Sequence, residues 1–377
     1  MTKSPQSDDW FISTSEELVR ACAALNASAW LAIDTEFERS RTFYAELCLL
    51  QIAAPGLICC IDPLAPIALT PLIKLLNEYS GVKVLHAARQ DLEVLYALTG
   101  QVLSAPVFDT QIAAALVGFA DNIGYADLVS QILGVALDKS QTRTDWRQRP
   151  LTPAQLSYAA DDVRYLDGVA VVLRERLAQL GRSEWLVEDC TALLNPTTYV
   201  QPVTSAWQRI KGIGALTAGA FARAIALASW RESMAREQNL PRGWVLKDNE
   251  LLDIAVGAPT SASELAAIGG TAAIGLLRRH REAVIELLHQ PTLEPTPLPP
   301  RRLNAAGRAL GKNLSAKAQA IAQDLAIAPT VLVARRELDG LIRGEMPARL
   351  QTGWRRTVLA PLLAEISPDG DPTCWEK

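Results

Sequence analysis

Short apolar runs alternate with amphipathic stretches through the first third of the chain. The runs predict β-strands at residues 31–33, 48–53, 57–61, 82–85 and 107–108. Ala54-Pro55-Gly56 separates the second run from the third and predicts a hairpin turn. Amphipathic periodicity predicts helices at 69–79 and 88–98. Strands that first meander and then alternate with helices predict an α/β layer with a mixed sheet.

From Thr152 onward the pattern is helical almost throughout. Thr152-Pro153 is typical of a helix start, with Thr as the N-cap and Pro in the first turn, and we expect that helix to continue towards Gly181. Five prolines lie within residues 290–300. Such a segment fits neither a helix nor a central strand, so it predicts an extended linker.

The helical regions on either side of this linker resemble each other. Residues 245–251 align with 332–338 at an offset of 87, and Gly257 and Gly344 keep that offset. The shared helix pattern predicts two related all-α modules of about 80 residues each. The expected domains are therefore an α/β domain at 1–195, a first helical module at 203–290, the linker at 291–300 and a second module at 301–377.

Charge is distributed unevenly along the chain. The net charge is −4, but residues 1–195 carry 15 basic and 24 acidic side chains, a net of −9, while both helical modules are mildly positive. An acidic front suits metal binding and a basic back suits a polyanion, although such modest charges are also typical of solvated surface. The six cysteines form no CxxC pair, which argues against a zinc or redox motif and fits reduced, buried thiols in the cytoplasm.

No apolar run approaches the roughly 20 residues that span a membrane. The N-terminus has no apolar core of the kind that signal peptides carry. We therefore expect a cytoplasmic protein without membrane association.

Two carboxylates stand at the end of the first predicted strand. Asp34 and Glu36 are one residue apart, so both side chains point to the same face. Unit charges about 4 Å apart repel by roughly 4 kcal/mol at an effective dielectric of 20. A cation or a proton should neutralise the pair, unless the two side chains are simply solvated at the strand end.

Three further side chains strengthen the metal interpretation. Asp91 begins the helix predicted after strand 82–85, and Tyr158 and Asp162 share one face of the later helix because they are four residues apart. Four carboxylates without His or Cys are the ligand set that Mg²⁺ or Mn²⁺ prefers. Two such ions about 3.5–4 Å apart are suited to phosphodiester cleavage. The neighbouring Asp161 points away and is expected to be solvated.

Three segments together resemble a known superfamily. They are DTEF (34–37), HAARQDLEVL (86–95) and YAADDVRYL (158–166), which resemble the exonuclease motifs of the DEDD superfamily, in its tyrosine branch. The segment LDKSQTRTDWRQRPLT (137–152) is similar to the ribonuclease D family, and the two helical modules resemble its HRDC domains (helicase and ribonuclease D C-terminal). The resemblance implies a ribonuclease H-like mixed sheet with helices, followed by two small all-α HRDC-like domains.

The resemblance also implies a role for each motif residue. Asp34 would bridge two divalent ions, Mg²⁺ or Mn²⁺. Glu36 and Asp162 would complete the site of the ion that carries the attacking water, and Asp91 would support the second ion through water. Tyr158 would orient the nucleophile or help to deprotonate it. These five residues are the expected catalytic set, and the four carboxylates are the expected metal ligands.

The implied function is that of a metal-dependent 3′→5′ exoribonuclease. It would trim single-stranded 3′ tails of tRNA precursors and other small structured RNAs and release nucleoside 5′-monophosphates, acting as a monomer without a nucleoside triphosphate cofactor. A DNA 3′→5′ repair exonuclease remains an alternative, because these motifs do not distinguish ribose from deoxyribose. A non-catalytic RNA-binding adaptor is the other alternative, and it is disfavoured because all four carboxylates and the tyrosine are present.

A basic segment adjoins the third motif. It contains Lys139, Arg143, Trp146, Arg147 and Arg149. Cations with an interleaved aromatic suit a single strand, whose phosphates pair with the cations and whose bases stack. Alternatively, the cations balance the neighbouring acidic residues. We expect two other polar residues to be structural: His86, and Asp109 as the cap of the following helix.

Overall fold

The computed structural model describes residues 9–142, 144–268, 276–290, 303–366 and 372–374. Arg143 and the proline-rich segment 291–300 lie outside these residues. Contacts divide the chain into two units. The first comprises Met1–Glu38, Leu47–Thr198 and Leu303–Lys377. The second comprises Arg39–Glu46 and Tyr199–Arg302.

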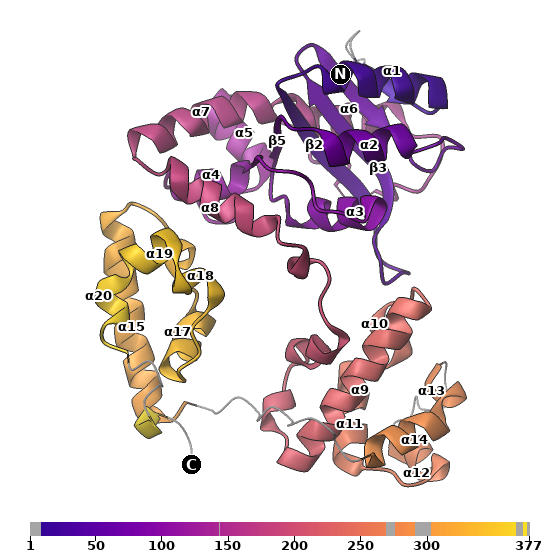
Figure 1. Cartoon of the computed structure of the whole chain (residues 1–377), viewed down its shortest axis with the longest axis vertical. Coiled ribbons are helices and arrows are strands. Elements are labelled where there is room, and N and C mark those ends of the chain that lie inside the picture. Colours follow the sequence, from indigo (N-terminus) through magenta and orange to yellow (C-terminus); the bar gives the residue numbers. More distant parts are fainter. Residues whose placement is uncertain (1–8, 143, 269–275, 291–302, 367–371, 375–377) are drawn as a thin grey trace. The chain divides into compact units, whose positions relative to one another are not determined.

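A six-stranded sheet forms the centre of the first unit, in the order β1-β4-β3-β2-β5-β6. Figure 1 shows β2, β3 and β5 of this sheet with helices around them. The strands of the sheet are β1 (Asp9–Ile12), β2 (Trp30–Glu38), β3 (Glu46–Ala54), β4 (Leu57–Ile61), β5 (Val82–Leu85) and β6 (Val107–Asp109). The β3–β4 pair is antiparallel, whereas β4 pairs parallel with β1, and β5 pairs parallel with both β2 and β6. The predicted hairpin and mixed sheet are thus confirmed.

Helices surround this sheet. They are α1 (Ser15–Asn26), α2 (Thr70–Glu78), α3 (Arg89–Thr99), α4 (Thr110–Leu116), α5 (Tyr125–Leu133), α6 (Pro153–Arg164), α7 (Leu166–Gln179) and α8 (Ser183–Leu193). α6 packs on β2, and Ala32 shares one buried cluster with Ala159 and Ala160 of that helix. Since side chains alternate along a strand, Asp34 and Glu36 lie on the same face as Ala32, towards α6.

Two features of this domain differ from the sequence prediction. The helix expected to run from Thr152 towards Gly181 is wrong as a single helix, because it breaks at Tyr165 between α6 and α7. There the Tyr165 amide donates to the Tyr125 hydroxyl (3.3 Å), a contact from another helix that periodicity does not reveal. β1 and α1 were not predicted, although Thr14 and Glu17 form a capping box that marks the start of α1.

The helical repeat predicted at an offset of 87 is confirmed. The second unit contains α9 (Ala218–Glu237), α10 (Arg242–Val245), α11 (Asp248–Gly257), α12 (Ala262–Ile268), α13 (Leu276–Arg279) and α14 (Arg281–His289). The C-terminal module contains α15 (Ala305–Asp324), α16 (Pro329–Leu332), α17 (Arg335–Ile342), α18 (Ala348–Gln351), α19 (Gly353–Val358) and α20 (Ala360–Leu363). α9 and α15 each have 20 residues and α10 and α16 each have four, at matching positions.

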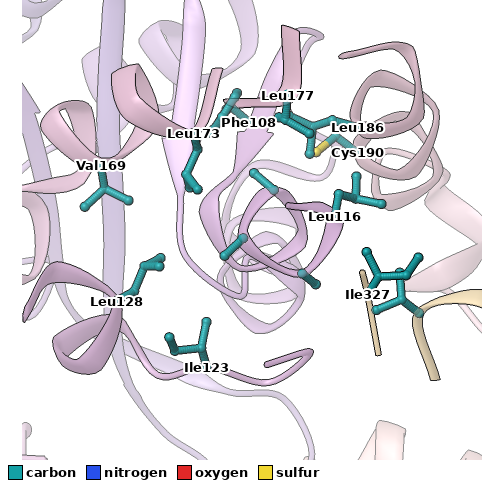
Figure 2. Close-up of a cluster of buried hydrophobic side chains, with 14 of the residues drawn as sticks. Phe108, Leu116, Ile123, Leu128, Val169, Leu173, Leu177, Leu186, Cys190 and Ile327 are labelled. Atoms are coloured by element: carbon teal, nitrogen blue, oxygen red, sulfur yellow. The ribbon is translucent and has the colours of Figure 1, made fainter. Parts of the chain in front are cut away.

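The C-terminal module shares a hydrophobic core with the α/β domain. Figure 2 shows Ile327, which follows α15, in one cluster with Leu116 and Leu186 of α4 and α8. The Trp354 ring stacks on Trp185, with the ring centroids 4.2 Å apart and the planes at 5°. The module is therefore part of the same folded unit as the sheet.

A buried ion pair completes this interface. The Arg355 guanidinium donates to both carboxylate oxygens of Asp189 in α8, with Nη2 2.9 Å from Oδ2. Only 8% of the Arg355 side chain and 11% of the Asp189 side chain are exposed. Gly353 in this segment has a φ of +77°, which favours glycine, and a Cβ there would lie 2.0 Å from Glu188 Oε1 and displace that carboxylate.

All six cysteines are buried and unbridged, as expected. Among the described residues, no helix is both long enough and apolar enough to cross a bilayer.

Asp189→Asn is expected to lower the free energy of unfolding by about 3 kcal/mol, because it leaves a buried guanidinium without its counter-charge. Urea unfolding measures the change. The control is Glu365→Gln, which breaks the exposed pair with Lys317 and should cost less than about 1 kcal/mol. Equally small effects of the two changes would contradict a contribution of the interface to stability.

Candidate active site

Three elements bring the predicted acidic residues together. Asp34 and Glu36 come from β2, Asp91 from the first turn of α3, and Asp162 from α6. Among the described residues, carboxylate oxygens of Asp34, Glu36 and Asp162 lie within 4.8 Å of one another. One oxygen from each residue could therefore hold the same cation.

Among the described residues, Asp91 is not part of this group of oxygens, but it lies near Asp34, whose pKa its charge raises. A hydrogen bond to β2 that the sequence did not predict holds it. Thr35 Oγ1 donates a hydrogen bond to Asp91 Oδ1 (2.5 Å), and both residues are buried. Thr35 lies between the two acids of β2, so strand alternation points its side chain to the opposite face. α3 packs against β2 and receives it there. No periodic signal in the sequence pairs these two residues.

The acidic side chains titrate far from their ordinary ranges. Burial raises the pKa of Asp34 well above its usual value, and the carboxylates of Asp91, Asp162 and Glu36 raise it further. Burial followed by repulsion from Asp162 and Asp91 raises the pKa of Glu36 to about 9. Burial also raises the pKa of Asp162 to about 7 and that of Asp91 to about 6. Clustered carboxylates that hold protons in this way suit a divalent cation, which would replace those protons.

Tyr158 lies beside this cluster on α6. Its hydroxyl lies near the side chains of Asp162 and Thr142, both of which affect its pKa. Burial and the nearby Asp162 carboxylate raise the Tyr158 pKa, so the phenol keeps its proton. It is therefore placed as a neutral hydrogen-bonding group at the edge of the acidic site.

The predicted RNA-binding residues of the basic segment before α6 differ in their exposure and in their partners. The Lys139 ammonium contacts Asp127 (2.7 Å) on the surface, and Arg147 contacts Asp145 (3.3 Å). Trp146 is buried, with its ring centroid 6.0 Å from that of Tyr158. Arg149 is bound to Asp62 (2.7 Å). RNA contact therefore stays a prediction for Lys139 and Arg147, while the structure gives Trp146 and Arg149 intramolecular partners.

Asp109 caps α4 as predicted, and it also holds the turn before α3. Its carboxylate accepts hydrogen bonds from the amides of Gln111 and Ile112 at the start of α4. It also accepts from the amides of Ala87 and Ala88. Ala87 has a positive φ of 55°, a costly conformation for a residue with a side chain. Asp109 thereby fixes the start of the helix that carries Asp91.

His86 has the structural surroundings expected of it. Its two ring nitrogens lie 2.9 Å from Thr110 Oγ1 and 3.0 Å from the Ile123 carbonyl oxygen. Burial lowers its pKa, which favours the neutral ring.

The metal-free protein is expected to lose stability as the pH rises from about 5 to about 9. The unfolded chain releases carboxylic protons near pH 4, whereas the folded site holds them until the pH passes about 7 for Asp162 and about 9 for Glu36. The folded state therefore binds more protons in this window, so the free energy of unfolding falls as the pH rises. Urea unfolding in EDTA at several pH values measures this fall.

Glu36→Gln provides the matched variant for that experiment. The introduced amide is neutral without taking up a proton, so this variant should stabilise the metal-free protein at pH 8 by on the order of 1–2 kcal/mol and flatten the pH dependence. A wild-type profile already flat between pH 5 and 9 would contradict the placement of these charges.

Known proteins resemble this chain over most of its length. It matches the 3′-5′ exonuclease family over residues 10–178 and the HRDC domain family over residues 220–286. Ribonuclease D of Jannaschia sp. (strain CCS1) is 37% identical over 361 residues, which are 92% of each protein. Ribonuclease D of Gluconacetobacter diazotrophicus is 36% identical and covers 93% of this chain and 91% of the relative.

A solved structure agrees with these relatives. The crystal structure of Escherichia coli RNase D superposes with a TM-score of 0.84 at 31% identity, covering 94% of this chain and 97% of that one. These similarities extend across the α/β domain with its acidic cluster and across the helical modules. The chain belongs to the ribonuclease D family and is a 3′→5′ exoribonuclease.

Proposed function

We propose that this enzyme trims single-stranded 3′ tails of tRNA precursors and other small structured RNAs and releases nucleoside 5′-monophosphates. The observation that carries the proposal is the cluster of Asp34, Glu36 and Asp162, whose oxygens lie within 4.8 Å of one another in a ribonuclease D chain. The substrate class is supported by the E. coli relative, which is described as an exoribonuclease involved in structured RNA processing. The buried, unbridged cysteines fit action in the cytoplasm.

The carboxylates are proposed to hold two divalent ions, Mg²⁺ or Mn²⁺. Bound there, such ions supply Lewis-acid activation of water and stabilisation of the leaving 3′-oxygen in phosphodiester hydrolysis. Asp34 is proposed to contact both ions, because its carboxylate lies within 4.8 Å of those of Glu36 and Asp162 and its pKa is raised by the nearby Asp91. The Thr35 hydrogen bond holds Asp91 Oδ1, and Asp91 is proposed to support an ion through water.

Tyr158 is proposed to orient the attacking water. Because its pKa is raised, the phenol acts as a hydrogen-bonding group and not as a base. Asp162 lies four residues later on the same face of α6, so the hydroxyl stands beside the proposed metal ligands.

The helical modules are proposed to add weak, non-specific RNA binding. Many of their cations are paired with acids of this chain, such as Arg231 with Asp248 and Arg349 with Glu337. Paired cations release fewer counterions from RNA, so we expect weak binding, which stays salt-sensitive because it depends on the small net positive charge of the modules. We propose that the enzyme acts as a monomer.

A degradation assay tests the substrate and the chemistry together. A 5′-labelled stem with a single-stranded RNA 3′ tail is compared with the same stem carrying a DNA tail, in Mg²⁺ or Mn²⁺. We expect stepwise shortening of the RNA tail that stops near the stem and is abolished by EDTA. Equal or faster loss of the DNA tail would indicate a repair exonuclease, and binding without shortening would indicate an adaptor.

Tyr158→Phe is expected to lower kcat by about 100-fold, because removal of one oriented hydrogen-bonding group at a reacting centre has costs of this order. Mn²⁺ affinity, measured by calorimetry, should stay within about twofold, since a neutral phenol is not needed as a ligand. Asp162→Asn is the comparison variant and should weaken Mn²⁺ binding. Equal loss of Mn²⁺ affinity in both variants would contradict the role of the tyrosine.

A further inference from the structure

Arg149 uses all of its hydrogen-bonding capacity within the protein. Nε and Nη2 bind the two carboxylate oxygens of Asp62, each at 2.7 Å. Nη2 also donates to the Cys48 carbonyl (2.7 Å). Nη1 donates to the carbonyls of Trp146 (2.7 Å) and Gln148 (2.9 Å). A guanidinium has five N–H groups, and these five bonds account for all of them.

The partners of Arg149 belong to the middle of the sheet. Asp62 directly follows β4, and its side chain is only 6% exposed, while Cys48 lies in β3. The Arg149 side chain itself is 25% exposed. The guanidinium therefore ties the segment before α6 to the ends of two neighbouring strands, and a phosphate could bind it only by displacing a nearly buried carboxylate.

The tied segment packs against the proposed catalytic tyrosine. Trp146, whose carbonyl Arg149 holds, is 4% exposed, and its ring lies 6.0 Å from that of Tyr158 at 38°. The segment is also fastened to the first turn of α6, because Gln155 bonds both Thr144 (3.2 Å) and the Thr152 amide (2.9 Å). The Tyr158 ring is therefore held by the same segment that Arg149 anchors.

We propose that Arg149 is a positioning residue for Tyr158, acting through Asp62 and Trp146, and is not an RNA contact. The inference rests on the proposed role of Tyr158 in orienting the attacking water. A positioning role predicts loss of turnover without loss of RNA affinity, because a small displacement of a reacting group is enough to slow the chemical step. A phosphate contact predicts the reverse, with weaker binding and a salt slope reduced by about one.

The test uses Arg149→Lys in the full-length enzyme. Lysine keeps the charge but cannot reproduce the bidentate contact and the carbonyl bonds together. We expect kcat on a tailed RNA to fall about 10- to 100-fold. KM, the RNA dissociation constant and its salt slope should stay within about twofold. Asp62→Asn should give the same pattern, and it serves as the second variant if Arg149→Lys does not fold.

A double-mutant cycle connects the effect to the tyrosine. In a Tyr158→Phe background, Arg149→Lys should lower kcat by less than about twofold, because the group that it positions is already gone. The matched control is Arg349→Lys, which alters a comparable bidentate pair with Glu337 in the C-terminal module. This control should leave kcat unchanged while reporting the general effect of weakening such a pair on stability.

Three results would overturn the inference. Weaker RNA binding with a lower salt slope and intact kcat would make Arg149 a phosphate contact. Losses of kcat that multiply in the double mutant would show that Arg149 and Tyr158 act independently, leaving the role of the tyrosine intact. Full kcat in Tyr158→Phe alone would refute the role of the tyrosine and the inference together.

Discussion

Repulsion among clustered, half-buried carboxylates is the constraint on which this structure depends. Asp34, Glu36 and Asp162 lie close enough to share a cation, and burial with mutual repulsion raises the Glu36 pKa to about 9. Flexible loops would let such groups move apart, so the chain places them on β2 and α6, elements whose backbones are fixed by sheet pairing and core packing. A cation that binds there relieves this repulsion, so metal binding and folding stability are coupled at the site.

Polar side chains around the site fix the segments that carry the site residues. Asp109 fixes the turn that starts α3, Thr35 fixes Asp91, and Arg149 fixes the segment that packs on Tyr158. None of the three is one of the proposed metal ligands. Each joins two elements that are distant in sequence, so the precision of the site depends on contacts that lie one step away from it. Such networks are stabilising only when every member is satisfied, as the five donors of Arg149 are.

The sequence could predict what depends on local pattern. Strand alternation and the spacing of Tyr158 and Asp162 placed the acidic set on facing surfaces, and an offset of 87 predicted the repeat. Periodicity says which face of an element is apolar but not which element covers that face. It therefore could not predict the helix break at Tyr165, or the core that Ile327 shares with the α/β domain. The basic segment shows the same limit of sequence prediction. Cations beside an aromatic residue give the same sequence pattern whether they bind RNA or, like Arg149, a buried carboxylate.

The two helical modules have the same local fold but bury their apolar side chains in different cores. In both, a glutamate binds the amide three residues before it: Glu250 with Lys247, and Glu337 with Ala334, 87 residues later. The first module closes on a core of its own, whereas the second contributes Ile327 and Trp354 to the core of the α/β domain. Side chains committed to that interface cannot also bind RNA. The C-terminal copy thus supports the catalytic unit with the surface that it buries, and any RNA binding by it must use its remaining faces.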